Sequence, residues 1–164
     1  MVSLKKNQSG FTIVELLIVI VIIGILAGLV ISTFVGVQQK ARNSERQTDI
    51  NTISGQLEAY YAKNSGYPSR DDLNDPAYWY DANEIRLGDD NKALADPSAP
   101  TTKELAAAAG NHVYAYVTTP ASCVSPTNDD GTANSGTFCT GYTLTATYED
   151  GKSPHDTYVK KSSN

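Results

Sequence analysis

A single carboxylate inside a long apolar run is the feature that most constrains this chain. Lys5 and Lys6 precede the segment Gly10-Phe11-Thr12-Ile13-Val14-Glu15, and after Glu15 no charge follows until Lys40. A charge within a membrane-spanning helix costs roughly 2.5–3.5 kcal/mol or more unless it has a partner. Glu15 is therefore a candidate functional residue.

The apolar run is long enough to cross a bilayer. A helix over residues 11–37 is roughly 40 Å long at about 1.5 Å per residue, and a single crossing needs about 20 residues. We therefore predict a transmembrane segment at 11–37, with the polar remainder of the chain beyond the inner membrane. Because lysines before a span favour the cytoplasmic side, residues 1–10 are expected to stay in the cytoplasm.

The N-terminus differs from a secretory signal peptide. Such peptides have an apolar stretch of about 7–15 residues, followed by a cleavage site with small residues. Here the apolar run is longer, and the small residue Gly10 precedes it. A cut after Gly10 would remove residues 1–10 as a leader peptide and leave the apolar helix in the product.

The basic leader, Gly10 and the Phe-Thr-x-x-Glu segment before an apolar helix resemble the N-terminus of type IV pilins and related pseudopilins. The resemblance implies that a prepilin peptidase cuts between Gly10 and Phe11 and methylates the new amine of Phe11. It also implies that an assembly ATPase and platform machinery move subunits from the inner membrane into a helical filament with the apolar helices at its centre.

The same resemblance gives Glu15 a partner, the Phe11 ammonium of a neighbouring subunit. An ion pair in a dry core can select register even where it adds little net stability. The alternative is a solvated Glu15 at the start of an ordinary anchor helix. Gly24 and Gly28 form a Gly-x-x-x-Gly pair that lets helices approach closely, and they are further candidate assembly residues.

Residues 38–64 are expected to continue the same helix as an amphipathic half, and Asn64 to Pro68 should end it. We expect one stripe to pack against a sheet: Val37, Ala41, Ser44, Thr48, Ile53, Leu57, Tyr60 and Tyr61. The remaining faces would carry the charged side chains of Lys40, Arg42, Glu45, Arg46, Asp49 and Glu58.

Residues 65–110 read as a connecting region with short helices, and 111–164 as an antiparallel sheet with a loop. Thr101-x-x-Glu104 has capping-box spacing before a short helix at 105–109, and Tyr78-Trp79-Tyr80 is a candidate aromatic anchor. Strand patterns cover 112–118, 142–148 and 157–159. The predicted fold class is α+β, a pilin-like lollipop with a long helical stem and a helix–sheet head.

Cys123 and Cys139 lie beyond the membrane segment, where an even cysteine count favours a disulfide. A bridge over this loop would contribute about 3 kcal/mol in the chain-entropy model. Two free thiols are the alternative.

The composition argues against several function classes. The net charge is −5, and no Lys/Arg stripe is present, so direct nucleic-acid binding is not expected. No catalytic or cofactor motif appears, so we predict no enzyme activity and no required cofactor. Calcium is an option at 128–131 or 89–91, although neither segment follows an EF-hand pattern.

The preferred function is a structural subunit of an extracellular type IV pilus that serves adhesion, twitching motility or DNA uptake. Two alternatives remain open. One is a pseudopilin of a type II secretion system. The other is a monomeric, membrane-anchored surface binding protein that keeps residues 1–10.

Overall fold

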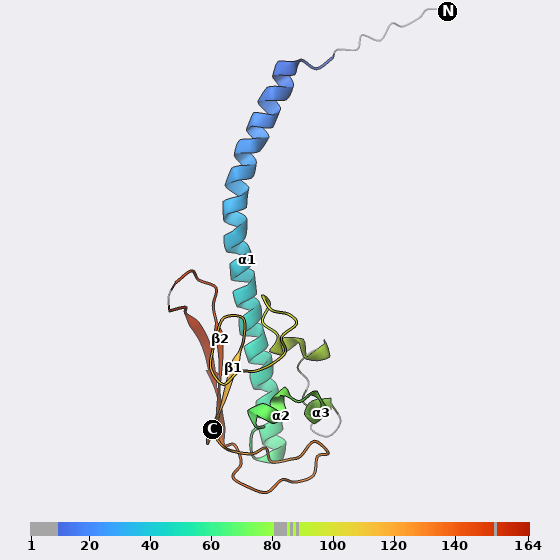
Figure 1. The fold of residues 1–164 in the computed structure, drawn as a ribbon, viewed down its shortest axis with the longest axis vertical. Helices are drawn as coiled ribbons and strands as arrows, with labels where there is room; N and C mark the ends of the chain where they lie inside the picture. The colour runs from blue at the N-terminus through green and yellow to red at the C-terminus, as the bar shows by residue number, and fades with distance from the viewer. Residues whose placement is uncertain (1–9, 81–84, 86, 88, 153) are drawn as a thin grey trace, which may run out of the picture. The chain divides into compact units, whose positions relative to one another are not determined.

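The computed structural model describes residues 10–80, 85, 87, 89–152 and 154–164. Lys5 and Lys6 lie outside the described residues. The chain divides into an N-terminal unit up to Gln38 and a C-terminal unit, Gln39–Asn164. Helix α1 (Ile13–Asn64) begins in the first unit and ends in the second, as Figure 1 shows.

The extent of α1 agrees with the helix predicted from Phe11 to about Lys63. Its 52 residues contain no proline, and its charged residues are Glu15 and those from Lys40 onward. The helix ends where Ser65 adopts a left-handed conformation with φ of 57°. The Ser65 amide still donates to the carbonyl of Tyr61 at 2.8 Å, which closes the last turn.

Three antiparallel strands in the order β1-β2-β3 form the sheet of the C-terminal unit. They are β1 (Ala115–Thr119), β2 (Gly141–Thr147) and β3 (Thr157–Lys161). In β2 the side chains of Tyr142, Leu144 and Ala146 are buried, and the alternating threonines are half-buried. This alternation places one face of the sheet in the core and leaves the other toward solvent.

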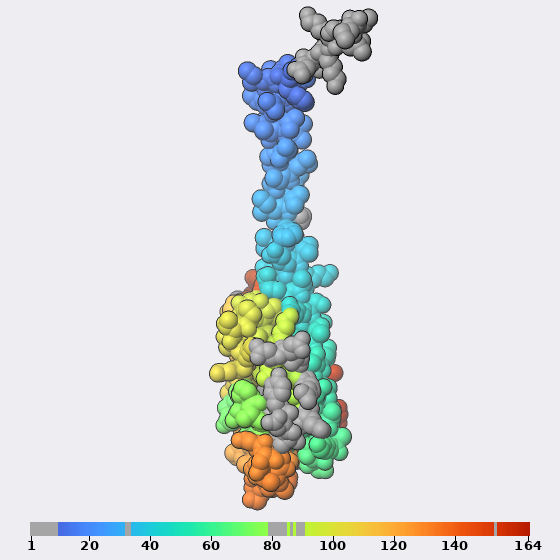
Figure 2. All heavy atoms as spheres, turned by 90° about the vertical axis from the view of Figure 1, so that its right-hand side faces the viewer, coloured from blue at the N-terminus to red at the C-terminus, as the bar shows by residue number. Residues whose placement is uncertain are grey.

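The second half of α1 packs against the buried face of the sheet, which confirms the predicted α+β class. The buried side chains from α1 are Ile50, Ile53, Leu57 and Tyr60, and those from the sheet include Tyr116, Tyr142 and Leu144. Figure 2 shows the segment near residues 95–110 in yellow lying along this unit, with the disulfide-bonded loop in orange at one end.

Short helices occur in the connecting region, as expected: α2 (Arg70–Asn74), α3 (Pro76–Tyr80) and the 3₁₀ helix η1 (Asp89–Leu94). Tyr78 is fully buried, and its hydroxyl bonds to that of Tyr60 at 2.7 Å. The side chains of Trp79 and Tyr80 lie outside the described residues, so the predicted aromatic anchor is represented by Tyr78.

The predicted helix at 105–109 is wrong. The backbone amide of Ala106 donates to the Tyr114 carbonyl at 2.8 Å, and the Ala106 carbonyl accepts from Tyr116 at 2.9 Å. The Asn74 side chain meanwhile bonds both backbone groups of Leu105. These non-local bonds hold the segment extended beside β1, so the capping-box spacing at Thr101 has no helix to cap.

The predicted packing stripe of α1 is also partly wrong. Ala41, Ser44 and Thr48 are exposed, whereas Arg46 is only 1% exposed. The buried positions that follow Arg46, at 50, 53, 57 and 60, keep helical spacing with it. The charge of Arg46 predicts a position on the solvent face, but a buried counterion, Asp96, lets it occupy the core stripe.

The candidate assembly segment and the ion cluster

The first turn of α1 contains a reciprocal set of hydrogen bonds between Thr12 and Glu15. The backbone amide and the hydroxyl of Thr12 both donate to Glu15 Oε2 at 2.8 Å. The backbone amide of Glu15 donates in return to Thr12 Oγ1 at 3.2 Å. This is a capping box, which satisfies amide groups that the helix itself cannot pair.

The role of Thr12 was not among the predictions above, although its Thr-x-x-Glu spacing is the sequence signal for a capping box. The cap engages only Oε2, and within the described residues Glu15 Oε1 accepts no bond. A cation from a second chain can therefore approach Oε1 without breaking the cap. The structure places Phe11 beside this turn, where its side chain is 79% exposed.

The first part of α1 presents an uncovered apolar surface. Every large apolar side chain described from Phe11 to Val37 has an exposed fraction of 46% or more. Within the described residues, α1 is the helix that is long and apolar enough to cross a membrane, with a mean hydropathy of 3.1 over its best window. Such a surface needs lipid or other helices to cover it.

Gly24 and Gly28 lie on this exposed part of α1. A Cβ atom at either position would meet no heavy atom within 4 Å, so no described side chain packs against them. Glycine within a helix costs roughly 0.5–1 kcal/mol relative to alanine. Within the described residues, no contact inside the chain requires glycine at these two positions.

A buried ion cluster joins α1 to two later segments of the C-terminal unit. Arg46 donates from Nε to Asp96 Oδ2 at 2.7 Å and from Nη2 to Asp96 Oδ1 at 2.8 Å. Its Nη2 also contacts Glu149 Oε1 at 2.6 Å. Glu149 accepts further bonds from Arg42 and from the Ser98 hydroxyl. Arg46 and Asp96 are only 1% and 2% exposed.

The cluster keeps both carboxylates ionised. Burial alone would raise the pKa of Asp96, but bonds from Arg46 and the Ser98 backbone amide outweigh it, so this pKa lies below its usual value. The Arg42 guanidinium, with help from Ser98 and Arg46, holds the pKa of Glu149 well below its usual range. A paired and hydrogen-bonded geometry is what a buried charge requires.

The same cluster includes one group that resembles a metal site. Asp96, His112 and Glu149 have ligand atoms within 4.8 Å of one another. Arg46 Nη2 donates to one oxygen of Asp96 and to one oxygen of Glu149, so the guanidinium occupies the position that a metal ion would need. The group therefore does not fit a metal ion. At the candidate calcium segment 128–131, Asp130 Oδ1 instead accepts two bonds from Thr132.

Asp49 on α1 responds to burial in the opposite way from Asp96. Burial raises its pKa from 3.8 to about 6, although the Tyr114 hydroxyl donates to its carboxylate at 2.8 Å. An acid whose pKa is raised on folding binds protons more strongly in the native state. The ionised form therefore reduces stability, and this cost appears as the pH rises from about 4 to about 6.

We expect Asp49→Asn to stabilise the C-terminal unit by about 1–2 kcal/mol at pH 7.5, a value reduced from the full shift because the site is partly exposed. The amide oxygen can still accept from Tyr114. At pH 4 the gain should vanish, because Asp49 is then protonated in the wild type. Urea unfolding of both proteins at the two pH values measures this, and an equal difference at both would contradict it.

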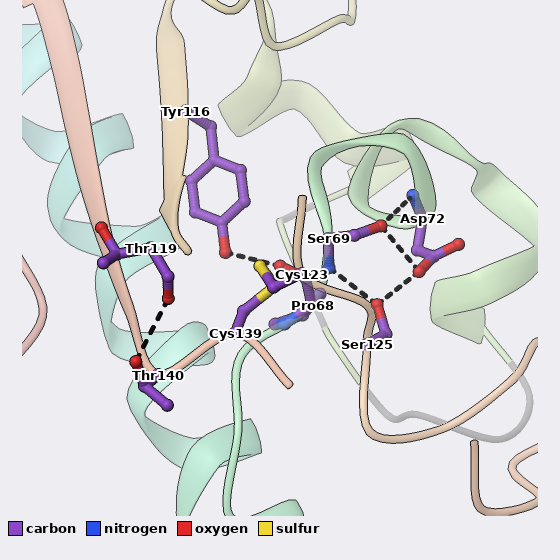
Figure 3. The surroundings of a disulfide bond; sticks show 9 residues. All are labelled: Pro68, Ser69, Asp72, Tyr116, Thr119, Cys123, Ser125, Cys139 and Thr140. Atoms are coloured by element: carbon purple, nitrogen blue, oxygen red, sulfur yellow. Dashed lines mark hydrogen bonds between the residues drawn. A yellow bond between two sulfur atoms is a disulfide. The ribbon is translucent and has the colours of Figure 1, made fainter. Parts of the chain in front are cut away.

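Cys123 and Cys139 form the predicted disulfide, with their Cα atoms 4.9 Å apart. Figure 3 shows the polar contacts around it. The Tyr116 hydroxyl donates to the Pro68 carbonyl at 2.8 Å, and the Ser69 amide donates to Ser125 Oγ at 2.7 Å. Ser125 also donates to Asp72, so two hydrogen bonds of Ser125 hold the loop after Cys123 against the start of α2.

Comparison with known proteins agrees with the N-terminal geometry. The family description "Prokaryotic N-terminal methylation motif" matches residues 5–31. The chain is similar to the "Type II secretion system core protein G" of Dickeya chrysanthemi, 39% identical over 66 residues (40% of this chain, 43% of the relative). The protein of that name from Aeromonas hydrophila is 42% identical over 65 residues (40% and 46%). No solved structure matches significantly.

The exposed apolar part of α1 and its capped start therefore lie in a segment that matches a prokaryotic N-terminal methylation motif. The chain carries the N-terminal methylation motif and is similar to type II secretion core proteins G over about 40% of its length. It spans less than half the length of the curated relatives named above.

Proposed function

We propose that this chain is a pseudopilin, the repeating subunit of a periplasmic filament in a type II secretion system. The observation that supports this most is the similarity of its N-terminal 40% to type II secretion core proteins G from several bacteria. In this proposal a prepilin peptidase removes residues 1–10 after Gly10 and methylates Phe11. Residues 11–37 form first the membrane anchor and then the filament core.

The physical basis of assembly is the transfer of the exposed apolar side chains of α1 from lipid to neighbouring helices. Lipid and leucine side chains are similarly apolar, so close packing and polar contacts decide the association of such helices. Gly24 and Gly28 supply positions of close approach. Glu15, with Oε1 open, supplies the acceptor for a Phe11 ammonium from the next subunit.

An extracellular type IV pilus is the second candidate. The disulfide-bonded loop supports it, because many pilins have such a loop near the C-terminus, although here β2 and β3 follow Cys139. Deleting the gene distinguishes the two. Secreted enzymes retained in the periplasm support the pseudopilin, whereas normal secretion with loss of surface fibres supports the pilus.

Gly10→Val tests the processing step that both candidates share. We expect the variant to stay in the membrane fraction at its full precursor mass, because the peptidase needs the small residue before the cut. The wild type should lose residues 1–10 and gain one methyl group on Phe11. Intact-mass spectrometry reads both changes, and a normally processed Gly10→Val protein would remove the assignment.

A further inference from the structure

A hollow of about 440 Å³ lies at the end of the sheet where α1 and the last residues of the chain meet. Its volume falls within the range of about 300–1,000 Å³ that is usual for small-molecule sites. The residues around it come from α1, from both ends of the β1–β2 connection and from the C-terminus. They include Tyr61, Thr119, Thr143, Lys161, Ser162 and Asn164.

The hollow offers hydroxyl groups with spare hydrogen-bonding capacity. Within the described residues, the hydroxyls of Thr119 and Thr143 make no hydrogen bond, and Ser162 Oγ donates at 3.1 Å to a backbone oxygen of Asn164. Each hydroxyl can both donate and accept. A Cβ on Gly141, which also lines the hollow, would lie 3.1 Å from Ser162 Oγ, so glycine limits crowding there.

Two tyrosines, Tyr61 and Tyr142, border the hollow. Tyr61 stacks on Tyr67 with ring centroids 4.7 Å apart and an angle of 29° between the planes. Stacking fixes the Tyr61 ring and covers one of its faces, while the side chain remains half-buried. A fixed aromatic surface beside several hydroxyls suits a ligand with both a C–H-rich face and hydroxyl groups.

Lys161 adds a positive charge to these groups. It is exposed and makes no ion pair with any described residue, and no Asp or Glu side chain lines the hollow. Lys161 pairs across the sheet with Thr143, whereas Lys160 pairs with Leu144, whose side chain is in the core. Because successive residues of a strand face opposite sides, Lys161 lies on the side of Thr143, and both residues line the hollow, whereas Lys160 does not line it.

We propose that this hollow binds an acidic saccharide, a sugar unit that carries a carboxylate. The three hydroxyls and the Asn164 amide would pair with sugar hydroxyls, Tyr61 would pack against the C–H face, and Lys161 would pair with the carboxylate. This ligand site on the C-terminal unit goes beyond the proposed role in filament assembly and does not depend on it.

The test uses the full-length chain in detergent micelles, so it needs no filament. Calorimetric titration at 0.15 M salt compares cellobiouronic acid with its neutral counterpart, cellobiose. We expect the acidic disaccharide to bind about threefold or more tightly than the neutral one, as an exposed ion pair allows. Lys161→Gln should remove this preference, and Tyr61→Leu should weaken binding of both sugars about fivefold.

Lys160→Gln is the matched control, because it removes the same charge from the opposite side of the same strand. It should bind both sugars as the wild type does. Absence of binding to either sugar, equal affinity for the two, or equal effects of Lys160→Gln and Lys161→Gln would each overturn the proposal. If sugar binding fails while processing and assembly are normal, the saccharide site is refuted and the proposed role in the filament still stands.

Discussion

Replacing Arg46 by methionine is expected to destabilise the C-terminal unit by about 3–5 kcal/mol. The substitution leaves the Asp96 carboxylate, which is 2% exposed, without its bidentate guanidinium partner. A buried charge without a counterion is among the most costly defects in a folded protein. The loss is a large part of the roughly 5–15 kcal/mol that stabilises a typical domain.

The pH dependence separates this effect from lost packing. In the wild type the lowered pKa values of Asp96 and Glu149 provide stability that is fully present above about pH 5 and lost as the pH falls through those values. In Arg46→Met, burial should raise the Asp96 pKa instead. The deficit of the variant should therefore shrink as the pH falls from 7.5 to 5, as urea unfolding of the two full-length proteins would show.

Arg42→Met is the matched control. Arg42 is 32% exposed and bonds only to Glu149 in the cluster, so its removal should destabilise the unit much less than removal of Arg46 does. The double variant Arg46→Met with Asp96→Asn should recover part of the loss, because no buried charge remains. A deficit in Arg46→Met that is small, or independent of pH, would contradict the proposed role of the cluster.

Glu15→Gln is expected to abolish filament assembly while leaving the helix cap intact. Glutamine at this position of a capping box can still accept from Thr12, as Glu15 Oε2 does. It cannot neutralise a Phe11 ammonium in an apolar filament core. Leaving that cation unpaired should cost about 3 kcal/mol or more per subunit, which raises the concentration needed for assembly at least about 100-fold.

Electron microscopy and immunoblotting of filaments produced by wild-type and variant cells measure this effect. Thr12→Val is the complementary control, since it removes the hydroxyl of the cap but keeps the carboxylate. It should reduce assembly far less than Glu15→Gln does. Wild-type filament yield from Glu15→Gln would show that the carboxylate serves the helix cap alone.

Local sequence patterns were sufficient to predict the long helix in the N-terminal half of the chain. The apolar run, Gly10 and Glu15 stand next to one another in the sequence, and a helix needs only contacts between near neighbours. For the same reason the end of α1 near Asn64 and the strands rich in Thr, Tyr and Val were predicted within a few residues. The capping box of Thr12 and Glu15 is equally local, and the Thr-x-x-Glu spacing is enough to predict it.

The errors concern residues whose state depends on distant partners. Arg46 looks like a surface residue until Asp96, 50 positions later, provides its counterion in the core. The segment at 105–109 has helical composition, but Asn74 and β1 hold its backbone extended. No local pattern contains the positions of these partners, so sequence reasoning assigned each residue by its intrinsic preference.

The sequence by itself therefore indicated a membrane-length helix, a basic segment with a candidate cleavage site after Gly10, and an acid within an apolar run, because each is a property of adjacent residues. Only the tertiary structure decided which face of the outer helix is covered, where its charges are neutralised, and which side of β3 carries Lys161 into a hollow. Those features arise because segments far apart in the chain pack together, so that contacts between them replace contacts with water.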